Sequence, residues 1–553
     1  MIFKYTLVIF LNLFFCSLVF AQQGIGISAS PRLNHASNDG SIGKIMFSSH
    51  AIPAEEFKTA NFLEAYELTN KSNLFITVTL RKKLTSYLQE LAPELSPDSL
   101  SKIGNYQFSF FVDQKLIYQT NLLPGAPSAT QQRTQTSWNK PLIDNVHEGA
   151  WWSQSAWNRF MYNGGDTALT EGAHVLIIEL RPYIKASEIK VGPIIAAGEL
   201  NIRVNRKPVI NLNAVRLSPV KAYDGFPVSH EKFDINRIKA LRANIEADVF
   251  KHITSIVVIK RGKILIEEYF NDSGRDSLHD MRSVGKSFAS TLTGIAIREG
   301  YLKSEQQSLK DFYHLKSFKT YSPAKGNVTI KDLLTMSSAF DGDDNDPQSP
   351  GNEENMYPTN NWVKFVLDLP VDTNNYQGQW HYFTGGAMLL GNILDGLVPG
   401  GLEAYAEREL FSHLGISKYQ WEHTPQHVAN TAGGIRMNSL DFAKFGQLYQ
   451  NAGTWNSQKV LTKDWVARSF TKHKQIIDRK GEYYGYLFWN KTYHSKNKNY
   501  ETFYSSGNGG NEIFVFKDQP LVIVITATAY GTAYAHRQAD LIVEKYLLPA
   551  ILR

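Results

Sequence analysis

The residues of this chain best suited to chemistry are a serine and a lysine three positions apart, in Ser283-Val284-Gly285-Lys286. On a helix, such a pair lies one turn apart on the same face. A serine beside an amine fits a nucleophile whose proton is taken by a neighbouring base. Ser-x-x-Lys occurs ten times in the chain, so this spacing alone selects no site.

The segments around Ser283 distinguish this tetrad from the other nine. Two strand-like runs, 253–260 and 264–269, precede it and are joined by a turn at Arg261-Gly262. An amphipathic helix pattern opens on the tetrad and stops at Gly300. Its apolar stripe consists of Val284, Phe288, Leu292 and Ile295. A hairpin leading into a nucleophile at the start of a helix is therefore predicted only at Ser283.

A tyrosine is the expected third member of a serine–lysine relay. The literal triplet Tyr449-Gln450-Asn451 ends a predicted helix, which is an unfavourable place for it. Tyr382 follows a glycine-containing turn and opens an apolar helix, so it is the better candidate, although a lone tyrosine is more often structural. Both interpretations of Tyr382, a relay member and a structural residue, stay open at this point.

A glycine-rich stretch, Ser505-Ser506-Gly507-Asn508-Gly509-Gly510, lies where two predicted strands join near the C-terminus. Small residues at a strand end let backbone approach a ligand closely. A backbone N–H from this stretch, together with that of Ser283, would bind an oxyanion. The alternative is an ordinary glycine-rich hairpin turn.

Together these stretches resemble the penicillin-recognising serine hydrolases, in the branch of class C β-lactamase-like esterases and 6-aminohexanoate-dimer hydrolases. The resemblance covers about residues 234–552. It is carried by the three stretches above and by segments 264–270, 281–287, 332–338, 433–436, 441–448 and 484–489. It implies that Ser283 is the acylated nucleophile, Lys286 its proton acceptor and Tyr382 the acid and base.

Two departures from the family pattern bear on the substrate. Thr384 stands where the penicillin-recognising enzymes usually have Asn, and Ser505-Ser506-Gly507 stands where β-lactamases have Lys-Thr-Gly. Without that lysine, no cation is expected there to hold a β-lactam carboxylate. We therefore expect ester or amide hydrolysis, with Ser505, Ser506, Gly507, Asn508 and Thr384 binding substrate or oxyanion.

Other motifs fit poorly, and we expect no cofactor and no metal. Gly285-Lys286-Ser287 has the end of a phosphate loop, but Asp280 occupies the position of its first glycine. Neither Gly-x-Ser-x-Gly nor His-Glu-x-x-His occurs. The acidic loop 341–346 starts like a calcium-binding loop, yet its glycine is in the wrong place, so we interpret it as the rim of a site.

The chain of 553 residues is long enough for several domains. Segments 22–207 contain short strand patterns and predict a β-sandwich-like accessory domain. A Pro- and Gly-containing connector, 208–226, leads to a hydrolase domain, 227–553. Strands at both ends of that domain, with helices between them, predict an α+β fold of the β-lactamase/transpeptidase type: an antiparallel sheet with a helical insert.

Residues 1–21 resemble a secretion signal: Lys4, an apolar run, and Val19-Phe20-Ala21 as a cleavage site. The single cysteine, Cys16, lies inside this segment. The mature protein is therefore expected to be exported to the periplasm or the extracellular space and to contain no cysteine, which excludes disulfides and thiol catalysis.

The partners expected from composition are few. The net charge of +6 arises from 58 basic and 52 acidic side chains without a concentrated basic block, which argues against nucleic acid. Four of the ten tryptophans fall between Trp138 and Trp157. Buried aromatics are the commoner case, although an exposed set could give the N-terminal domain a cell-envelope or glycan contact.

The resulting hypothesis is an exported serine hydrolase that cleaves a small ester or amide through an acyl-enzyme on Ser283. Two alternatives stay open: a true β-lactamase or DD-peptidase, and a non-catalytic cell-envelope or glycan-binding protein on a hydrolase scaffold. The joint presence of Ser283, Lys286 and Tyr382 favours the enzyme.

Overall fold

The structure, a computed structural model, describes residues 42–53, 56–57, 61–122, 124, 133–145, 152–186, 188–346, 349–373, 376–476, 479–532 and 534–552. The predicted signal segment, 1–21, lies outside these ranges. Within them, no helix has both the length and the apolar content needed to cross a membrane.

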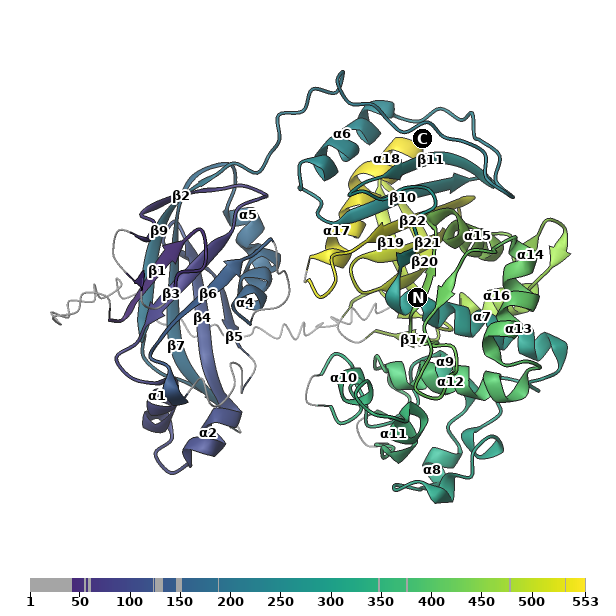
Figure 1. The fold of residues 1–553 in the computed structure, drawn as a ribbon, viewed down its shortest axis with the longest axis horizontal. Helices are drawn as coiled ribbons and strands as arrows, with labels where there is room; N and C mark the ends of the chain where they lie inside the picture. The colour runs from purple at the N-terminus through teal and green to yellow at the C-terminus, as the bar shows by residue number, and fades with distance from the viewer. Residues whose placement is uncertain are drawn as a thin grey trace, which may run out of the picture. The chain divides into compact units, whose positions relative to one another are not determined.

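The N-terminal part is built on one sheet of nine strands (Figure 1). The strands are β1 (Lys44–Ser48), β2 (Ala65–Leu68), β3 (Leu74–Thr79), β4 (Gly104–Val112), β5 (Lys115–Asn121), β6 (Ser137–Ile143), β7 (Gly172–Lys185), β8 (Ile189–Val191) and β9 (Ala196–Val204). Their order is β5-β4-β7-β9-β1-β3-β6, with β2 also on β9 and β8 on β7. The helices are α1 (Leu84–Leu91), α2 (Pro97–Ile103), α4 (Trp152–Phe160) and α5 (Asp166–Ala168).

Residues from most strands of this sheet share one hydrophobic core. Ile76 of β3, Phe110 of β4 and Ile178 of β7 are fully buried in it. Trp138 and Trp157 are buried in the same core, so they do not form an exposed sugar-stacking surface. The part is therefore β-rich, as predicted, while its sandwich character stays a prediction.

The C-terminal part is built on an antiparallel sheet of eight strands in the order β11-β10-β22-β21-β20-β19-β18-β17. These strands are β10 (Ile253–Lys260), β11 (Lys263–Tyr269), β17 (Lys474–Gln475), β18 (Tyr483–Tyr484), β19 (Trp489–Ser495), β20 (Lys498–Gly507), β21 (Asn511–Phe516) and β22 (Leu521–Ala527). Because β10 pairs with β22, the sheet joins both ends of the domain, as the strand pattern predicted.

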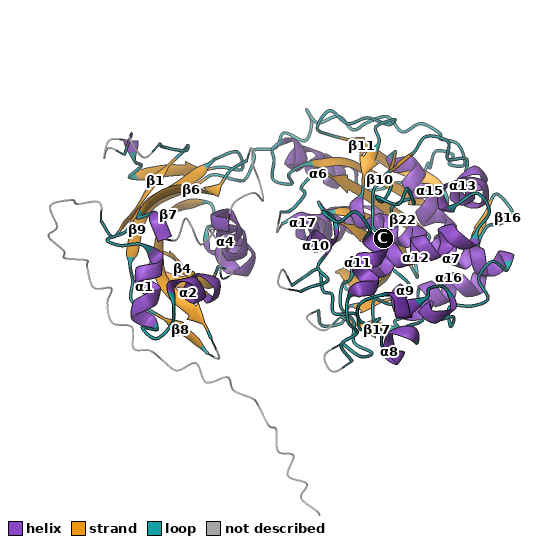
Figure 2. Ribbon diagram, turned by 60° about the horizontal axis from the view of Figure 1, so that its bottom comes forward, coloured by secondary structure: helices purple, strands orange, loops and turns teal. Residues whose placement is uncertain are grey.

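Helices cover both faces of this sheet, and the alternation of side chains along β10 shows why (Figure 2). Ile256 and Val258 point into a core with α6 (Ile235–Glu246) and the C-terminal helix. Val257 and Ile259 belong to the core that holds the nucleophile helix. With a period of two, a strand rich in β-branched residues buries both of its faces.

The helical elements of this part lie between and after the strands. The longer ones are α6, α7 (Gly285–Glu299), α11 (Trp362–Asp368), α12 (Thr384–Leu397), α15 (Ser439–Gln450), α16 (Lys463–Ser469) and α17 (Ala535–Leu541), which continues through Ile542–Leu547 into α18 (Leu548–Ile551). Shorter ones are α8 (Pro323–Gly326), α9 (Ile330–Leu334), α10 (Glu353–Met356), α13 (Leu402–Ala406) and α14 (Ser412–Leu414). Small strands are β12 (His279–Asp280), β13 (Gln420–Trp421), β14 (Ile435–Met437), β15 (Thr454–Trp455) and β16 (Gln458–Lys459).

One predicted strand, 484–489, is interrupted. The strand β18 ends at Tyr484 and β19 begins at Trp489. Leu487 has a left-handed backbone (φ 57°), and its N–H donates to the carbonyl of Leu334 at 2.8 Å. A tertiary contact therefore takes the place of sheet pairing in this segment.

The end of the predicted connector belongs to the C-terminal part. Phe226 is buried in its main core, and the Tyr223 hydroxyl donates to Asp441 Oδ1 at 3.1 Å. Ser218 N–H donates to Glu268 Oε1 at 2.9 Å. The C-terminal part thus includes the chain from Ser218 onward, and fully exposed Val209 lies in the segment before it.

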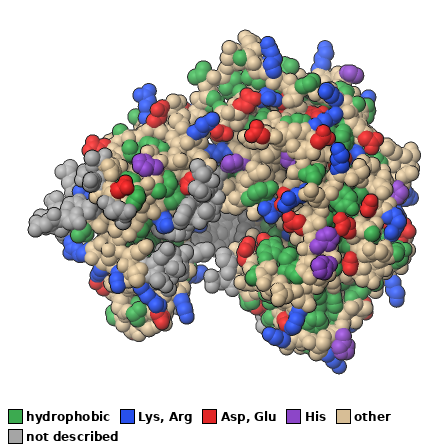
Figure 3. All heavy atoms as spheres, in the orientation of Figure 1, with side chains coloured by type: hydrophobic (Ala, Val, Ile, Leu, Met, Phe, Trp, Pro, Cys, Tyr) green, Lys and Arg blue, Asp and Glu red, His purple; other side chains and the backbone are tan. Residues whose placement is uncertain are grey.

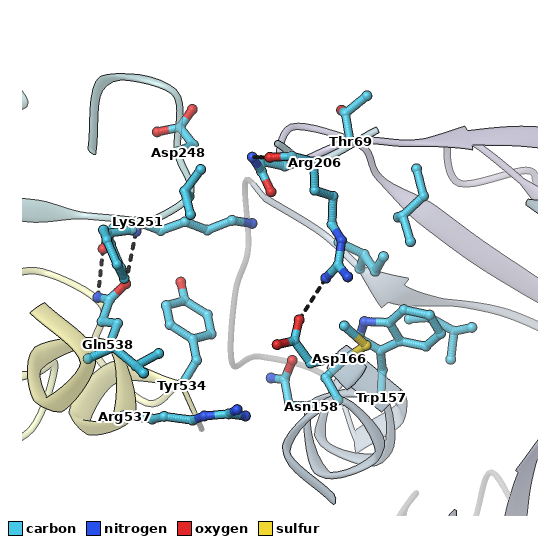
Figure 4. A pocket seen from close by; sticks show the side chains of 18 of the residues that line it. Thr69, Trp157, Asn158, Asp166, Arg206, Asp248, Lys251, Tyr534, Arg537 and Gln538 are labelled. Carbon is cyan, nitrogen blue, oxygen red and sulfur yellow. Dashed lines mark hydrogen bonds and ion pairs between the residues drawn. The ribbon is translucent and has the colours of Figure 1, made fainter. Parts of the chain in front are cut away.

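Polar side chains fix chain segments within each part (Figure 4). In the N-terminal part, Arg206 Nη1 lies 2.9 Å from Asp166 Oδ1 of α5. In the C-terminal part, the Gln538 amide of α17 accepts from Lys251 N–H at 2.9 Å and donates to the Lys251 carbonyl at 2.8 Å. This pair of bonds ties the segment before β10 to the C-terminal helix.

Charged side chains of both signs are interspersed over the face drawn in Figure 3. That face shows no continuous basic surface of the kind that binds a nucleic-acid backbone.

Candidate active site

Ser283 and Lys286 meet at the start of α7. Ser283 lies in a short 3₁₀ turn, Arg282–Val284, and Lys286 lies in the first turn of α7. Lys286 Nζ is 2.8 Å from Ser283 Oγ and donates to the Ala432 carbonyl at 2.8 Å. Only 2% of Lys286 is exposed. A buried amine in hydrogen-bond contact with a serine hydroxyl has the geometry of a base beside its nucleophile.

The backbone that presents Ser283 is tightly packed and locally strained. Arg282 has φ 51°, a left-handed value that is unfavourable for a residue with a side chain. A Cβ on Gly285 would lie 3.0 Å from Gly433 Cα, so the Gly433 loop contacts the nucleophile turn at backbone distance. The Gly433-Gly434 segment therefore packs directly against the backbone turn that carries Ser283.

Tyr382 also lies next to the Lys286 amine. Lys286 Nζ lies 5.2 Å from the centroid of its ring. The Tyr382 ring stacks on Trp489 with centroids 5.7 Å apart, and Trp489 contacts Trp380 at 5.4 Å. Tyr449, the alternative, is buried, and its hydroxyl lies 2.8 Å from Thr291 Oγ1 inside the core. The structure thus brings Tyr382 to Lys286, next to an aromatic wall.

The glycine-rich stretch meets Ser283 at the end of β20. A Cβ on Gly507 would overlap the Met281 carbonyl and would lie 3.1 Å from Ser283 N. Only glycine permits this approach. Asn508 is exposed just beyond, and its Oδ1 accepts from Gly531 N–H at 2.9 Å. The strand end therefore lies against the backbone of Ser283, while an oxyanion site formed by their N–H groups stays a prediction.

Three other predicted binding residues turn their side chains into the protein. Ser505 is 1% exposed, and its hydroxyl donates to Ser287 Oγ at 2.8 Å. Ser506 donates to Glu512 Oε1 at 3.0 Å. Thr384 is completely buried as the first residue of α12. Their side chains thus support the walls of the site.

The comparisons with known proteins agree with this arrangement. The family model described as Beta-lactamase matches residues 241–547, more than half of the chain. The chain belongs to the β-lactamase family. In this chain, the sheet built from both ends of the domain carries the helix after Ser283 against one face. The fold class predicted for the catalytic domain is confirmed, and the chain is a serine hydrolase of this family.

Solved structures with a similar fold carry several activities in their names. A candidate 6-aminohexanoate-dimer hydrolase from Bacillus anthracis is 16% identical, with 60% of this chain and 91% of that chain covered and a TM-score of 0.47. A penicillin-binding protein from Bacillus halodurans is 16% identical, with 55% and 99% covered and a TM-score of 0.44. A family VIII carboxylesterase is 16% identical, with 57% and 97% covered and a TM-score of 0.44. No curated protein matches the chain.

Two residues of this β-lactamase-family site escaped sequence reasoning. Trp489 lay within a segment predicted as strand, and nothing in the sequence pairs it with Tyr382. Asp344 lay in the acidic loop, where it was one carboxylate among several. Its Oδ2 accepts from Thr384 N–H at 2.6 Å, directly behind Tyr382. Both contacts join segments far apart in sequence, so local patterns could not reveal them.

Proposed function

We propose that this β-lactamase-family hydrolase is exported and cleaves esters or linear amides through an acyl-enzyme on Ser283. The observation that carries the proposal is the 2.8 Å contact between buried Lys286 Nζ and Ser283 Oγ, with Tyr382 over the same amine. Export rests on the sequence of residues 1–21 alone.

The reaction follows from these positions. Ser283 Oγ attacks the carbonyl carbon while its proton passes to the Lys286 and Tyr382 pair. The oxyanion formed on the carbonyl oxygen accepts from the backbone N–H groups of Ser283 and the β20 end. The leaving oxygen or nitrogen takes the proton and departs. Water then attacks the acyl-enzyme, its proton passes through the same pair, and Ser283 is released.

The end of β20, from Ser505 to Gly507, forms one wall of the site, the strand wall. This wall favours substrates without a carboxylate beside the scissile bond. The position of the β-lactamase lysine holds Ser505, whose hydroxyl is already bonded to Ser287. A hydrogen bond to a charged group contributes about 1.5–3 kcal/mol, so its absence costs a β-lactam roughly ten- to a hundredfold in transition-state binding. The aromatic wall of Trp489 and Trp380 favours an aryl or other apolar group.

A substrate panel tests the proposal. We expect measurable kcat/KM for short-chain aryl esters or small linear amides, weak or no turnover of penicillins and cephalosporins, and no turnover of either class by Ser283→Ala. A cephalosporin kcat/KM above that for every ester and linear amide would establish a β-lactamase instead. Absence of turnover and of Ser283 acylation would favour the non-catalytic alternative.

A further inference from the structure

The carboxylate of Asp344 binds the starts of two helices beside the active site. Its Oδ2 accepts from Thr384 N–H of α12 at 2.6 Å, and its Oδ1 accepts from Glu353 N–H of α10 at 2.8 Å. The proposed reaction assigns this side chain no step. A carboxylate at a helix N-terminus satisfies N–H groups that have no partner inside the helix, and it is stabilised by the positive end of the helix dipole.

The backbone of Asp344 holds the residue that matters to catalysis. Asp344 N–H donates to the Tyr382 carbonyl at 2.8 Å. The carbonyl of Tyr382 and the N–H two residues later are therefore both bound by one residue of the acidic loop. The position before α12 is Phe383, which offers no side-chain acceptor to the helix. Asp344 thus supplies from another segment the cap that the local sequence lacks.

Burial and charge connect Asp344 to the catalytic pair. Burial and, to a smaller extent, the nearby Glu353 carboxylate raise the pKa of Asp344 to about 6, although its bonds to Thr384 and the charge of Lys286 act in the opposite direction. The titratable groups near it are Glu353 of α10, Tyr357 just after α10, Lys286 of α7, and Tyr382. Asp344 is therefore bonded to the backbone on both sides of Phe383, next to Tyr382, and it interacts electrostatically with Lys286.

We propose that Asp344 is a positioning residue that holds the Tyr382 turn so that the Tyr382 ring stays over Lys286. This inference rests on the proposed function, because it assigns Tyr382 a part in proton transfer. Asp344 touches backbone groups and acts through Tyr382.

The first test compares Asp344→Asn with Asp346→Asn, an exposed aspartate of the same loop. An amide presents only one oxygen acceptor, so one of the two helix N–H groups loses its partner. We expect the kcat of Asp344→Asn for an aryl ester to fall about ten- to a hundredfold, the value of one charge-assisted hydrogen bond, with KM within about twofold. Asp346→Asn should match the wild type. Equal kcat values in the two variants would overturn the proposal.

The second test separates positioning from general destabilisation. In a Tyr382→Phe background, Asp344→Asn should lower the remaining kcat by less than about twofold, because residues that act through one another are not additive. A loss in that background as large as in the wild type would contradict the proposal, whatever the thermal midpoint of the variant.

The third readout is the pH profile of kcat. Protonation of Asp344 removes an acceptor, so wild-type kcat should fall as the pH drops through about 6, and this limb should be absent in Asp344→Asn. An unchanged acidic limb would contradict the proposal. A wild-type protein that neither turns over an ester nor is acylated on Ser283 would refute the proposed function itself. An active wild type whose kcat does not change in Asp344→Asn would refute only the role of Asp344.

Discussion

The two walls of the Ser283 site are built on opposite principles. On the strand wall, β20 brings Gly507 to Ser283 through backbone alone, while Ser505 donates inward to Ser287. On the helical wall, the Lys286 amine lies over the Tyr382 ring and contacts the Ser283 hydroxyl. One wall contacts the nucleophile turn with backbone, and the other offers groups that can move a proton.

This difference indicates which changes the site tolerates. The strand wall needs the absence of a side chain at Gly507, so steric changes should damage it most. The helical wall needs particular functional groups held in place, so chemical changes that preserve shape should damage it most. A variant series can separate the two dependences.

The largest expected effect is on the helical wall. Lys286→Ala and Tyr382→Phe should each lower kcat by about 10²–10⁴-fold, the usual contribution of general acid–base help. The two losses should not add in the double variant, because the residues act as a unit. Steady-state kinetics with an aryl ester measures this. Tyr449→Phe is the matched control and should keep wild-type kcat; near-normal activity of Tyr382→Phe would point to another tyrosine.

Next in size is a steric change on the strand wall. In Gly507→Ala the new methyl group overlaps the Met281 carbonyl, so the end of β20 must move away from Ser283. A displacement of about 1 Å can cost about 10²-fold in rate. Gly396→Ala, whose Cβ would meet open space, should leave kcat/KM unchanged. If both variants behaved alike, the strand end would not shape the site.

A smaller effect concerns stability on the strand side, at His279 of β12, four residues before Ser283. Burial lowers the pKa of His279 to about 4. The unfolded chain takes up this proton near pH 6.5 and the folded chain only near 4, so stability is lost as the pH falls between these values. The loss amounts to about 3 kcal/mol.

Denaturant unfolding at several pH values measures this loss. His279→Gln should remove this part of the pH dependence of the free energy of unfolding, whereas replacing exposed His494 by Gln should keep it. If the free energy of unfolding of His279→Gln fell with pH as it does in the wild type, another group would cause the acid sensitivity.

The smallest expected effect follows from removing the N-terminal part. Both walls are built from residues after Ser218, and the linker residue Val209 is fully exposed. A fragment starting at residue 210 should stay folded, with kcat/KM within about twofold of the full chain, since domains with their own core fold alone. Circular dichroism and ester kinetics test this; an insoluble or inactive fragment would mean that the N-terminal part completes the domain.

Local patterns predicted much of this molecule. The β10 and β11 hairpin and the helix after Ser283 lie where alternation and apolar periodicity placed them. The spacing of Ser283 and Lys286, together with the helix pattern that follows it, predicted their contact, and the 3₁₀ turn before α7 keeps the two residues one turn apart.

Contacts between distant segments could not be predicted in this way. Neither the turn at Leu487 nor the cap that Asp344 gives to α12 follows from its own segment, because each depends on a partner that the fold brings near. The inward turn of Ser505 has the same origin: its partner Ser287 lies on α7.

The central claim is that Ser283 is the nucleophile activated by Lys286, and intact-mass spectrometry after treatment with a fluorophosphonate tests it most directly. The account predicts one adduct per wild-type chain, located by peptide mapping on Ser283, much slower labelling of Lys286→Ala, and none of Ser283→Ala. An adduct on another residue, or equal labelling of wild type and Ser283→Ala, would contradict it.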